Sequence, residues 1–184
     1  MGDATGHGMR AGTMVTAAKT LFGIFCRDRD LTETLSRSTL ALKRMNLRKL
    51  AMALTLAQYR DGALRITAAG MPPVCIHRAS TGEVEQIDLP GMPLGAVARF
   101  PYGSQVVQLQ QGDAVLFMTD GFPERLGAED ELLGYERAVE VFRAAASGGA
   151  AEIIESLHHA AEQWAEGRAA DDDVTFVVLK MRTA

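Results

Sequence analysis

The sequence has few cysteines, few aromatic residues and no long apolar run. Only two of its 184 residues are cysteines, and aromatic residues make up 6% of the chain. Cys26 and Cys75 both lie within apolar segments, which favours buried free thiols over a disulfide and agrees with a reducing cytoplasm. No apolar run approaches the ~20 residues that a membrane-spanning helix needs. We therefore expect a cytoplasmic protein that makes no contact with a membrane through this segment.

A signal peptide and a strong excess of one charge are also absent. Met1 runs directly into a glycine-rich stretch, without an apolar targeting segment. The formal net charge of -4 gives no electrostatic reason to expect a nucleic acid as partner. Hydrophobic residues at 47% and charged residues at 23% are typical of a globular protein, and the length suits one domain with a real core. We expect a single domain over residues 1–184.

Hydrophobic spacing predicts helices at both ends of the chain. Residues 9–25 and 31–46 each have one apolar stripe, and two more helices begin near Gly134 and after Gly149. The stripe residues are Met14, Ala18, Leu21 and Phe25; Leu31, Leu35, Leu42 and Met45; Tyr135, Ala138, Val139 and Phe142; and Ile153, Leu157, Ala161 and Trp164. Seven basic residues between Arg27 and Lys49 indicate either a solvated helix face or a surface for a protein partner.

Between the helices the sequence favours antiparallel strands. The predicted strands span residues 50–57, 64–67, 74–77, 84–87, 106–109 and 114–118. Arg60-Asp61-Gly62 predicts a hairpin, and we expect strands 106–109 and 114–118 to pair around Gln111-Gly112-Asp113. Residues 174–181 predict a last, central strand. Grouped helices and grouped hairpins indicate an α+β fold, in which two antiparallel sheets form a sandwich flanked by helix pairs.

The first eight residues place a carboxylate among glycines. In Gly2-Asp3-Ala4-Thr5-Gly6-His7-Gly8, the aspartate can offer an oxygen to a hard cation such as Mg²⁺ or Mn²⁺, and glycine lets backbone approach a ligand closely. Alternatively, Asp3 caps the helix that follows and the glycines form a turn. Both interpretations stay open on this segment alone.

Two further acidic sites also lie at the ends of strong structural elements. Asp120 follows the apolar strand 114–118, and Asp171-Asp172-Asp173 precedes the last strand. Carboxylates at strand ends can converge, and converging carboxylates repel unless a cation lies among them. A set of oxygen ligands indicates Mg²⁺ or Mn²⁺ rather than zinc. Alternatively, Asp120-Gly121 is a simple hairpin turn and the three aspartates form a solvated loop.

Taken together, three blocks resemble the signature motifs of a known enzyme family. They are Gly2 to Gly8, Thr119-Asp120-Gly121-Phe122-Pro123-Glu124 and Asp172-Asp173-Val174-Thr175. In order and spacing they resemble the metal-dependent (PPM, type 2C) protein phosphatases, in the bacterial SpoIIE/RsbU-type branch. Ala69-Gly70-Met71-Pro72-Pro73 and Met92-Pro93-Leu94-Gly95 resemble intervening segments of that branch. The resemblance implies a four-layer α-β-β-α sandwich.

The resemblance also implies a site for two ions, Mn²⁺ or Mg²⁺. Asp3 would bridge the ions, the Ala4 carbonyl would bind one, and Asp120 and Asp172 would complete the ligands, with Asp173 close by. The ions would activate a water that hydrolyses phosphoserine or phosphothreonine in a protein. Asp3, Asp120 and Asp172 would thus be essential for catalysis. His7 would act as an acid toward the leaving oxygen, or only support the site.

The resemblance implies partners as well. Relatives act in bacterial signal transduction and stress responses on phosphorylated proteins, such as anti-sigma-factor antagonists. We expect an upstream sensor or regulatory domain for this chain. Whether the protein forms a homodimer stays open.

Two departures from the family pattern leave other functions open. The acidic motif that relatives have on strands before Gly2 has no counterpart here, so we expect a phosphatase domain truncated at its N-terminus. Met71 stands where relatives often have histidine, and Asn is common near Ala69. One alternative is a non-catalytic PPM-fold module that binds or regulates a partner. Another is a different binuclear-metal phosphohydrolase with a small-molecule substrate.

Overall fold

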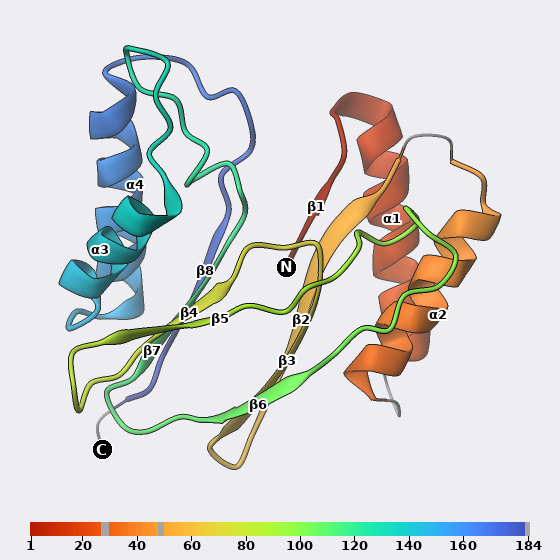
Figure 1. The fold of residues 1–184 in the computed structure, drawn as a ribbon, viewed down its shortest axis with the longest axis horizontal. Helices are drawn as coiled ribbons and strands as arrows, with labels where there is room; N and C mark the ends of the chain where they lie inside the picture. Colours follow the sequence, from red (N-terminus) through yellow and green to blue (C-terminus); the bar gives the residue numbers. More distant parts are fainter. Residues whose placement is uncertain (27–29, 48–49, 183–184) are drawn as a thin grey trace. The chain divides into compact units, whose positions relative to one another are not determined.

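Two antiparallel four-stranded sheets, each with its own pair of helices, make up the chain (Figure 1). This computed structural model describes residues 1–26, 30–47 and 50–182. The chain divides into two units, the first comprising residues 1–71 and 89–108, and the second residues 72–88 and 109 onward. The arrangement confirms the predicted α+β class with two antiparallel sheets and helix pairs.

The first unit contains the sheet β1-β2-β3-β6 and helices α1 and α2. Their bounds are β1 Gly2–Ala4, α1 Gly8–Phe25, α2 Leu31–Arg44, β2 Met52–Arg60, β3 Ala63–Ala69 and β6 Gln105–Gln108. One core joins the predicted helix stripes to β2. Its members include Met14, Ala18, Leu35, Leu42, Met52 and Leu56. The two helices therefore bury their apolar stripes against the sheet of the same unit.

The hairpin between β2 and β3 confirms the prediction at Arg60-Asp61-Gly62. Asp61 and Gly62 both have positive φ, 51° and 81°, as a two-residue turn between twisted strands requires. The predicted end of the second helix, at residue 46, lies two residues beyond the observed one. The helix stops at Arg44, and Met45 is its C-cap with 47% of its surface exposed, so Met45 does not belong to the apolar stripe.

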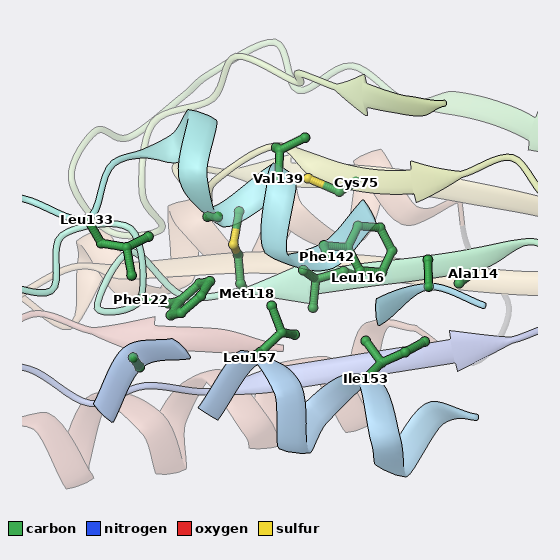
Figure 2. Close-up of a cluster of buried hydrophobic side chains, with 13 residues drawn as sticks. Cys75, Ala114, Leu116, Met118, Phe122, Leu133, Val139, Phe142, Ile153 and Leu157 are labelled. Atoms are coloured by element: carbon green, nitrogen blue, oxygen red, sulfur yellow. The ribbon is translucent and has the colours of Figure 1, made fainter. Parts of the chain in front are cut away.

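The second unit contains the sheet β5-β4-β7-β8 and helices α3 and α4. Their bounds are β4 Val74–His77, β5 Val84–Ile87, β7 Ala114–Met118, α3 Tyr135–Ala145, α4 Ala150–Ala165 and β8 Phe176–Lys180. All five residues of β7 are buried. Figure 2 shows Leu116 and Met118 of β7 packed with Phe142 of α3 and Leu157 of α4. This core fixes β7 along its whole length, up to Met118, which directly precedes Thr119.

Two predictions about strand partners are wrong. β6 pairs with β3, whereas β7 lies between β4 and β8, so the two strands do not form a hairpin. The turn between them is anchored elsewhere, because the buried Asp113 carboxylate accepts hydrogen bonds from the Ala79 and Gln110 amides, both at 3.0 Å. That contact places the beginning of β7 next to the end of β4. The last strand is an edge strand rather than a central one in the described sheet.

Both cysteines are free thiols, as predicted. Cys75 is fully buried in β4, and burial raises the pKa of its thiol to about 11. Cys26 is partly exposed, so only one of the two cysteines is buried as expected. Of the predicted basic segment, Arg27, Arg29, Arg48 and Lys49 lie outside the described residues. Among the residues that the structure describes, no helix is both long and apolar enough to cross a membrane.

Candidate metal centre

Asp120 lies two residues beyond the end of β7, after a buried threonine. Thr119 is 2% exposed, and its amide donates to the Thr175 carbonyl at 3.1 Å, which continues the pairing of β7 with β8. Asp120 then begins a turn, in which its carbonyl accepts a hydrogen bond from Glu124 at 2.8 Å. Since β7 pairs with β4 and β8, the turn at Asp120-Gly121 is not a simple hairpin between sheet neighbours.

The Thr119 side chain connects this turn to the second acidic block. Its hydroxyl donates to the Asp173 carbonyl at 3.1 Å and accepts from the Thr175 amide at 2.9 Å. The Asp173 amide in turn donates to the Asp172 carboxylate at 2.8 Å. Backbone on both sides of Val174 is therefore tied to the end of β7, which places Asp172 near Asp120.

Gly121 permits the close approach of these two segments. A Cβ atom at this position would lie 2.5 Å from the Asp173 carbonyl oxygen and 3.1 Å from its carbon. Both atoms belong to the main chain, so no side chain can rotate away to make room. Only a residue without a side chain fits here, which explains the glycine that directly follows the candidate ligand.

Asp120 and Asp172 bring carboxylate oxygens within 4.8 Å of each other. Asp120 is half-buried and Asp172 is exposed. The neighbouring Asp171 lies 3.7 Å from Arg168, but neither Asp120 nor Asp172 forms an ion pair within the described part of the chain. Two carboxylates this close repel each other unless a cation or proton lies between them. Their hard oxygen atoms fit Mg²⁺ or Mn²⁺, so this donor pair is compatible with the predicted ions.

Asp3 lies in the first unit, and its local structure rules out one of the two interpretations given above. Asp3 is in the middle of β1, paired with Ala53 of β2, and helix α1 begins only at Gly8. The N-cap of α1 is His7, so the interpretation of Asp3 as the helix cap is wrong. Residue 6 has φ 80°, a backbone conformation that favours the glycine found there.

His7 is exposed and its side chain makes no capping hydrogen bond. The placement of Asp3, Ala4 and His7 relative to the aspartates of the second unit stays a prediction. So does the position of Asp173, whose carboxylate is exposed beside Asp172.

Sequence reasoning missed Tyr135 as a neighbour of the acidic pair. The apolar stripe of the third helix included it, yet it is 39% exposed. Backbone hydrogen bonds from Gly134 to Pro123 at 2.8 Å and from Leu133 to Arg125 at 2.9 Å bring the start of α3 next to the Asp120 turn. Burial raises the pKa of the Tyr135 phenol, and the negative charges of Glu124 and Asp120 raise it further. The phenol is therefore a protonated donor close to the candidate ligands.

Comparison with known proteins adds a family and a fold. Residues 1–182 match the family model described as Stage II sporulation protein E (SpoIIE). The SiaA-PP2C domain of Pseudomonas aeruginosa is similar in structure, with a TM-score of 0.83 and 20% identity, over 97% of this chain and 73% of that one. The structure of the RsbU and RsbW domains of Rv1364c from Mycobacterium tuberculosis gives a TM-score of 0.75 and 26% identity, over 98% of this chain and 50% of that one.

A third similar structure comes from Bacillus subtilis. The PP2C phosphatase domain of SpoIIE, with a fragment of its regulatory domain, gives a TM-score of 0.76 and 21% identity, over 98% of this chain and 53% of that one. The chain thus spans about half the length of the second and third structures. These matches confirm the predicted PPM phosphatase-like fold over nearly the whole chain.

Proposed function

Because the chain belongs to the SpoIIE family, we propose that it is a metal-dependent protein phosphatase that hydrolyses phosphoserine or phosphothreonine on a signalling protein. The observation that supports this most directly is the pair Asp120 and Asp172, whose carboxylates come within 4.8 Å at neighbouring ends of β7 and β8. Their proximity requires a cation or proton, and the fold around them is that of PP2C domains.

Two ions, Mn²⁺ or Mg²⁺, are the proposed cofactors. Asp3, the Ala4 carbonyl, Asp120 and Asp172 would hold them, with Asp173 close by. Bound there, the ions would supply an activated water and bind the phosphoryl oxygens. Two similar structures are described with these metals: the Bacillus subtilis SpoIIE phosphatase domain presoaked with Mn (TM-score 0.62, 19% identity) and RsbX in complex with magnesium (0.64, 19%).

Two residues of the chain are proposed to act on the substrate directly. The His7 imidazole is exposed and makes no capping hydrogen bond, so it can deliver a proton to the leaving oxygen. The Tyr135 phenol, held protonated beside Asp120, can donate a hydrogen bond to the substrate. In this proposal the two aspartates of the second unit bind metal and transfer no proton.

The substrate is proposed to be a phosphorylated regulator of bacterial signalling, such as an anti-sigma-factor antagonist in the cytoplasm. Two similar proteins support a regulatory setting: one structure holds an RsbU and an RsbW domain, and the other a phosphatase domain with a regulatory fragment. We extend this to a sensor or regulatory domain for the present chain. Since one family model covers residues 1–182, both units are proposed to act as one phosphatase domain.

Hydrolysis of p-nitrophenyl phosphate with and without Mn²⁺ tests the activity. Asp120→Asn keeps the shape of the side chain but removes its charge, and we expect the rate to fall at least about 100-fold. Asp88→Asn makes the same chemical change at an exposed position and should leave the rate unchanged. Equal rates for wild type and Asp120→Asn would contradict the assignment of Asp120.

A second experiment separates the proposed activity from the alternatives. Phosphoserine and phosphothreonine peptides are compared with a panel of nucleotides and sugar phosphates, and a protein phosphatase should favour the peptides. Calorimetric titration with Mn²⁺ tests the non-catalytic alternative. A module without catalytic activity need not bind two ions tightly, whereas the proposed phosphatase should. Binding of two ions without hydrolysis of any substrate would therefore contradict the proposed activity while leaving the metal site intact.

A further inference from the structure

Two arginines connect the loop that contains Asp172 to the segment that follows Asp120. Both segments, residues 125–134 and 165–172, belong to the second unit. The Arg125 guanidinium donates from Nη1 to the Ala169 carbonyl at 2.8 Å and from Nη2 to the Arg168 carbonyl. A single planar guanidinium thus holds two successive carbonyls of the other segment.

Arg168 reaches in the opposite direction. Its Nη1 lies 3.3 Å from the Gly127 carbonyl and also pairs with the Asp130 carboxylate, while its Nε lies 3.7 Å from Asp171. Each segment therefore contains an arginine that binds the other one. The negative charges of Asp130 and Asp171 compensate the charge of Arg168.

This double contact, the Arg125–Arg168 clamp, lies immediately ahead of Asp172. Ala169 and Asp171 precede Asp172 by three residues and one residue, and on its other side the Thr119 hydroxyl holds the Asp173 carbonyl. Residues 168–175 belong to no helix or strand, so no regular ladder of hydrogen bonds orders them. Asp172 is held between two fixed points, of which the clamp is one.

We propose that Arg125 and Arg168 are positioning residues that hold Asp172 in its metal-binding place and thereby set the affinity of the site for Mn²⁺. The inference rests on the proposed role of Asp172 as a metal ligand. Neither arginine binds the ion. Each acts through the backbone of the Asp172 loop, which would otherwise have to be ordered when metal binds, at a cost in conformational entropy.

The sign of the effect distinguishes positioning from simple electrostatics. Removing a positive charge near a cation site should strengthen binding of the cation, because a repulsion is lost. Loss of a positioning contact should weaken binding instead, because the Asp172 loop is no longer held. A merely structural role predicts a lower melting temperature without a specific change in metal affinity.

Calorimetric titration of the full chain with MnCl₂ tests the proposal. We expect Arg125→Ala and Arg168→Ala to bind Mn²⁺ about 10- to 100-fold more weakly than wild type. Hydrolysis of p-nitrophenyl phosphate by both variants should return to the wild-type rate at saturating Mn²⁺. Arg137→Ala is the matched control: Arg137 stacks on Trp164 at 4.6 Å, outside both segments, and its loss should leave the affinity unchanged.

Arg125→Lys keeps the positive charge and is the variant to test if the alanine variants do not fold. One ammonium cannot bind both carbonyls with the geometry of a guanidinium, so we expect about 5-fold weaker Mn²⁺ binding from the lost hydrogen bond. Wild-type affinity in Arg125→Lys, or equal or tighter binding in folded alanine variants, would overturn the clamp and leave the proposed function standing. Failure of wild type to bind Mn²⁺ would instead overturn the proposed function itself.

Discussion

Thr119 and Thr175 exchange two hydrogen bonds beyond the last paired residues of β7 and β8. The Thr119 amide donates to the Thr175 carbonyl at 3.1 Å, and the Thr175 amide donates to the Thr119 hydroxyl at 2.9 Å. The second bond replaces a backbone acceptor with a side chain, so the strands can diverge after this point. Asp120 and Asp172 lie just past this junction, one on each segment.

Replacing Thr119 by valine should destabilise the protein by about 1–3 kcal/mol. Valine has the same shape but no hydroxyl, so the Thr175 amide and the Asp173 carbonyl lose their part-buried hydrogen bonds to Thr119. The free energy of unfolding in urea measures the loss. Thr119→Ser retains the hydroxyl and should keep most of the stability. An unchanged urea midpoint for Thr119→Val would show that water replaces the hydroxyl without cost.

Gly121→Ala should also destabilise, by about 1–3 kcal/mol, because the new methyl group would overlap the Asp173 main chain. The backbone of the Asp172 loop must then move, and Mn²⁺ binding should weaken together with stability. Gly12→Ala is the opposite control. In helix α1 a Cβ at residue 12 meets nothing within 4 Å, and alanine should stabilise the helix by roughly 0.5–1 kcal/mol. Urea unfolding of both variants should therefore shift the midpoint in opposite directions.

Local spacing was sufficient to predict many elements but not the partner of every strand. The bounds of β4, β5 and β7 agree with the predicted ranges, since short apolar runs between turn residues define them. The place of β7 beside β4 depends on Asp113, whose carboxylate binds the amide of Ala79, 34 residues away in sequence. No local pattern contains that contact, so sequence adjacency suggested the wrong hairpin.

The candidate site was predictable to a similar extent. Asp120 and Asp172 could be identified because each lies at the end of an apolar strand, and their proximity follows from the pairing of Met118 with Phe176. The roles of Arg125 and Arg168 could not, because a guanidinium that binds main-chain carbonyls leaves no pattern in the residues it contacts. Tyr135 was assigned to the apolar stripe of the third helix because its spacing matches that stripe. Its side chain instead lies near the charged groups of Glu124 and Asp120.

The buried Asp113 carboxylate, paired with the half-buried Arg78, should make the stability of the fold depend on pH in the acid range. Burial pushes the pKa of Asp113 upward, but hydrogen bonds from the Gln110 and Ala79 amides and the Arg78 guanidinium outweigh it and hold the pKa below its usual value. A carboxyl whose pKa is lower in the folded state stabilises the fold above its unfolded pKa of about 3.9, and that contribution is lost as pH falls through the folded pKa.

Asp113→Asn should therefore be less stable than wild type at pH 7, by about 1–3 kcal/mol, because a charged buried partner of Arg78 is lost. The difference should narrow as the pH drops below about 4, where the wild-type carboxyl also becomes neutral. Urea unfolding between pH 7 and pH 2.5 measures both curves. Asp61→Asn, at an exposed turn where the side chain is 91% exposed, should follow wild type throughout. A constant gap between Asp113→Asn and wild type at every pH would contradict the linkage, because the loss would then come from altered hydrogen bonding rather than from the ionised carboxylate.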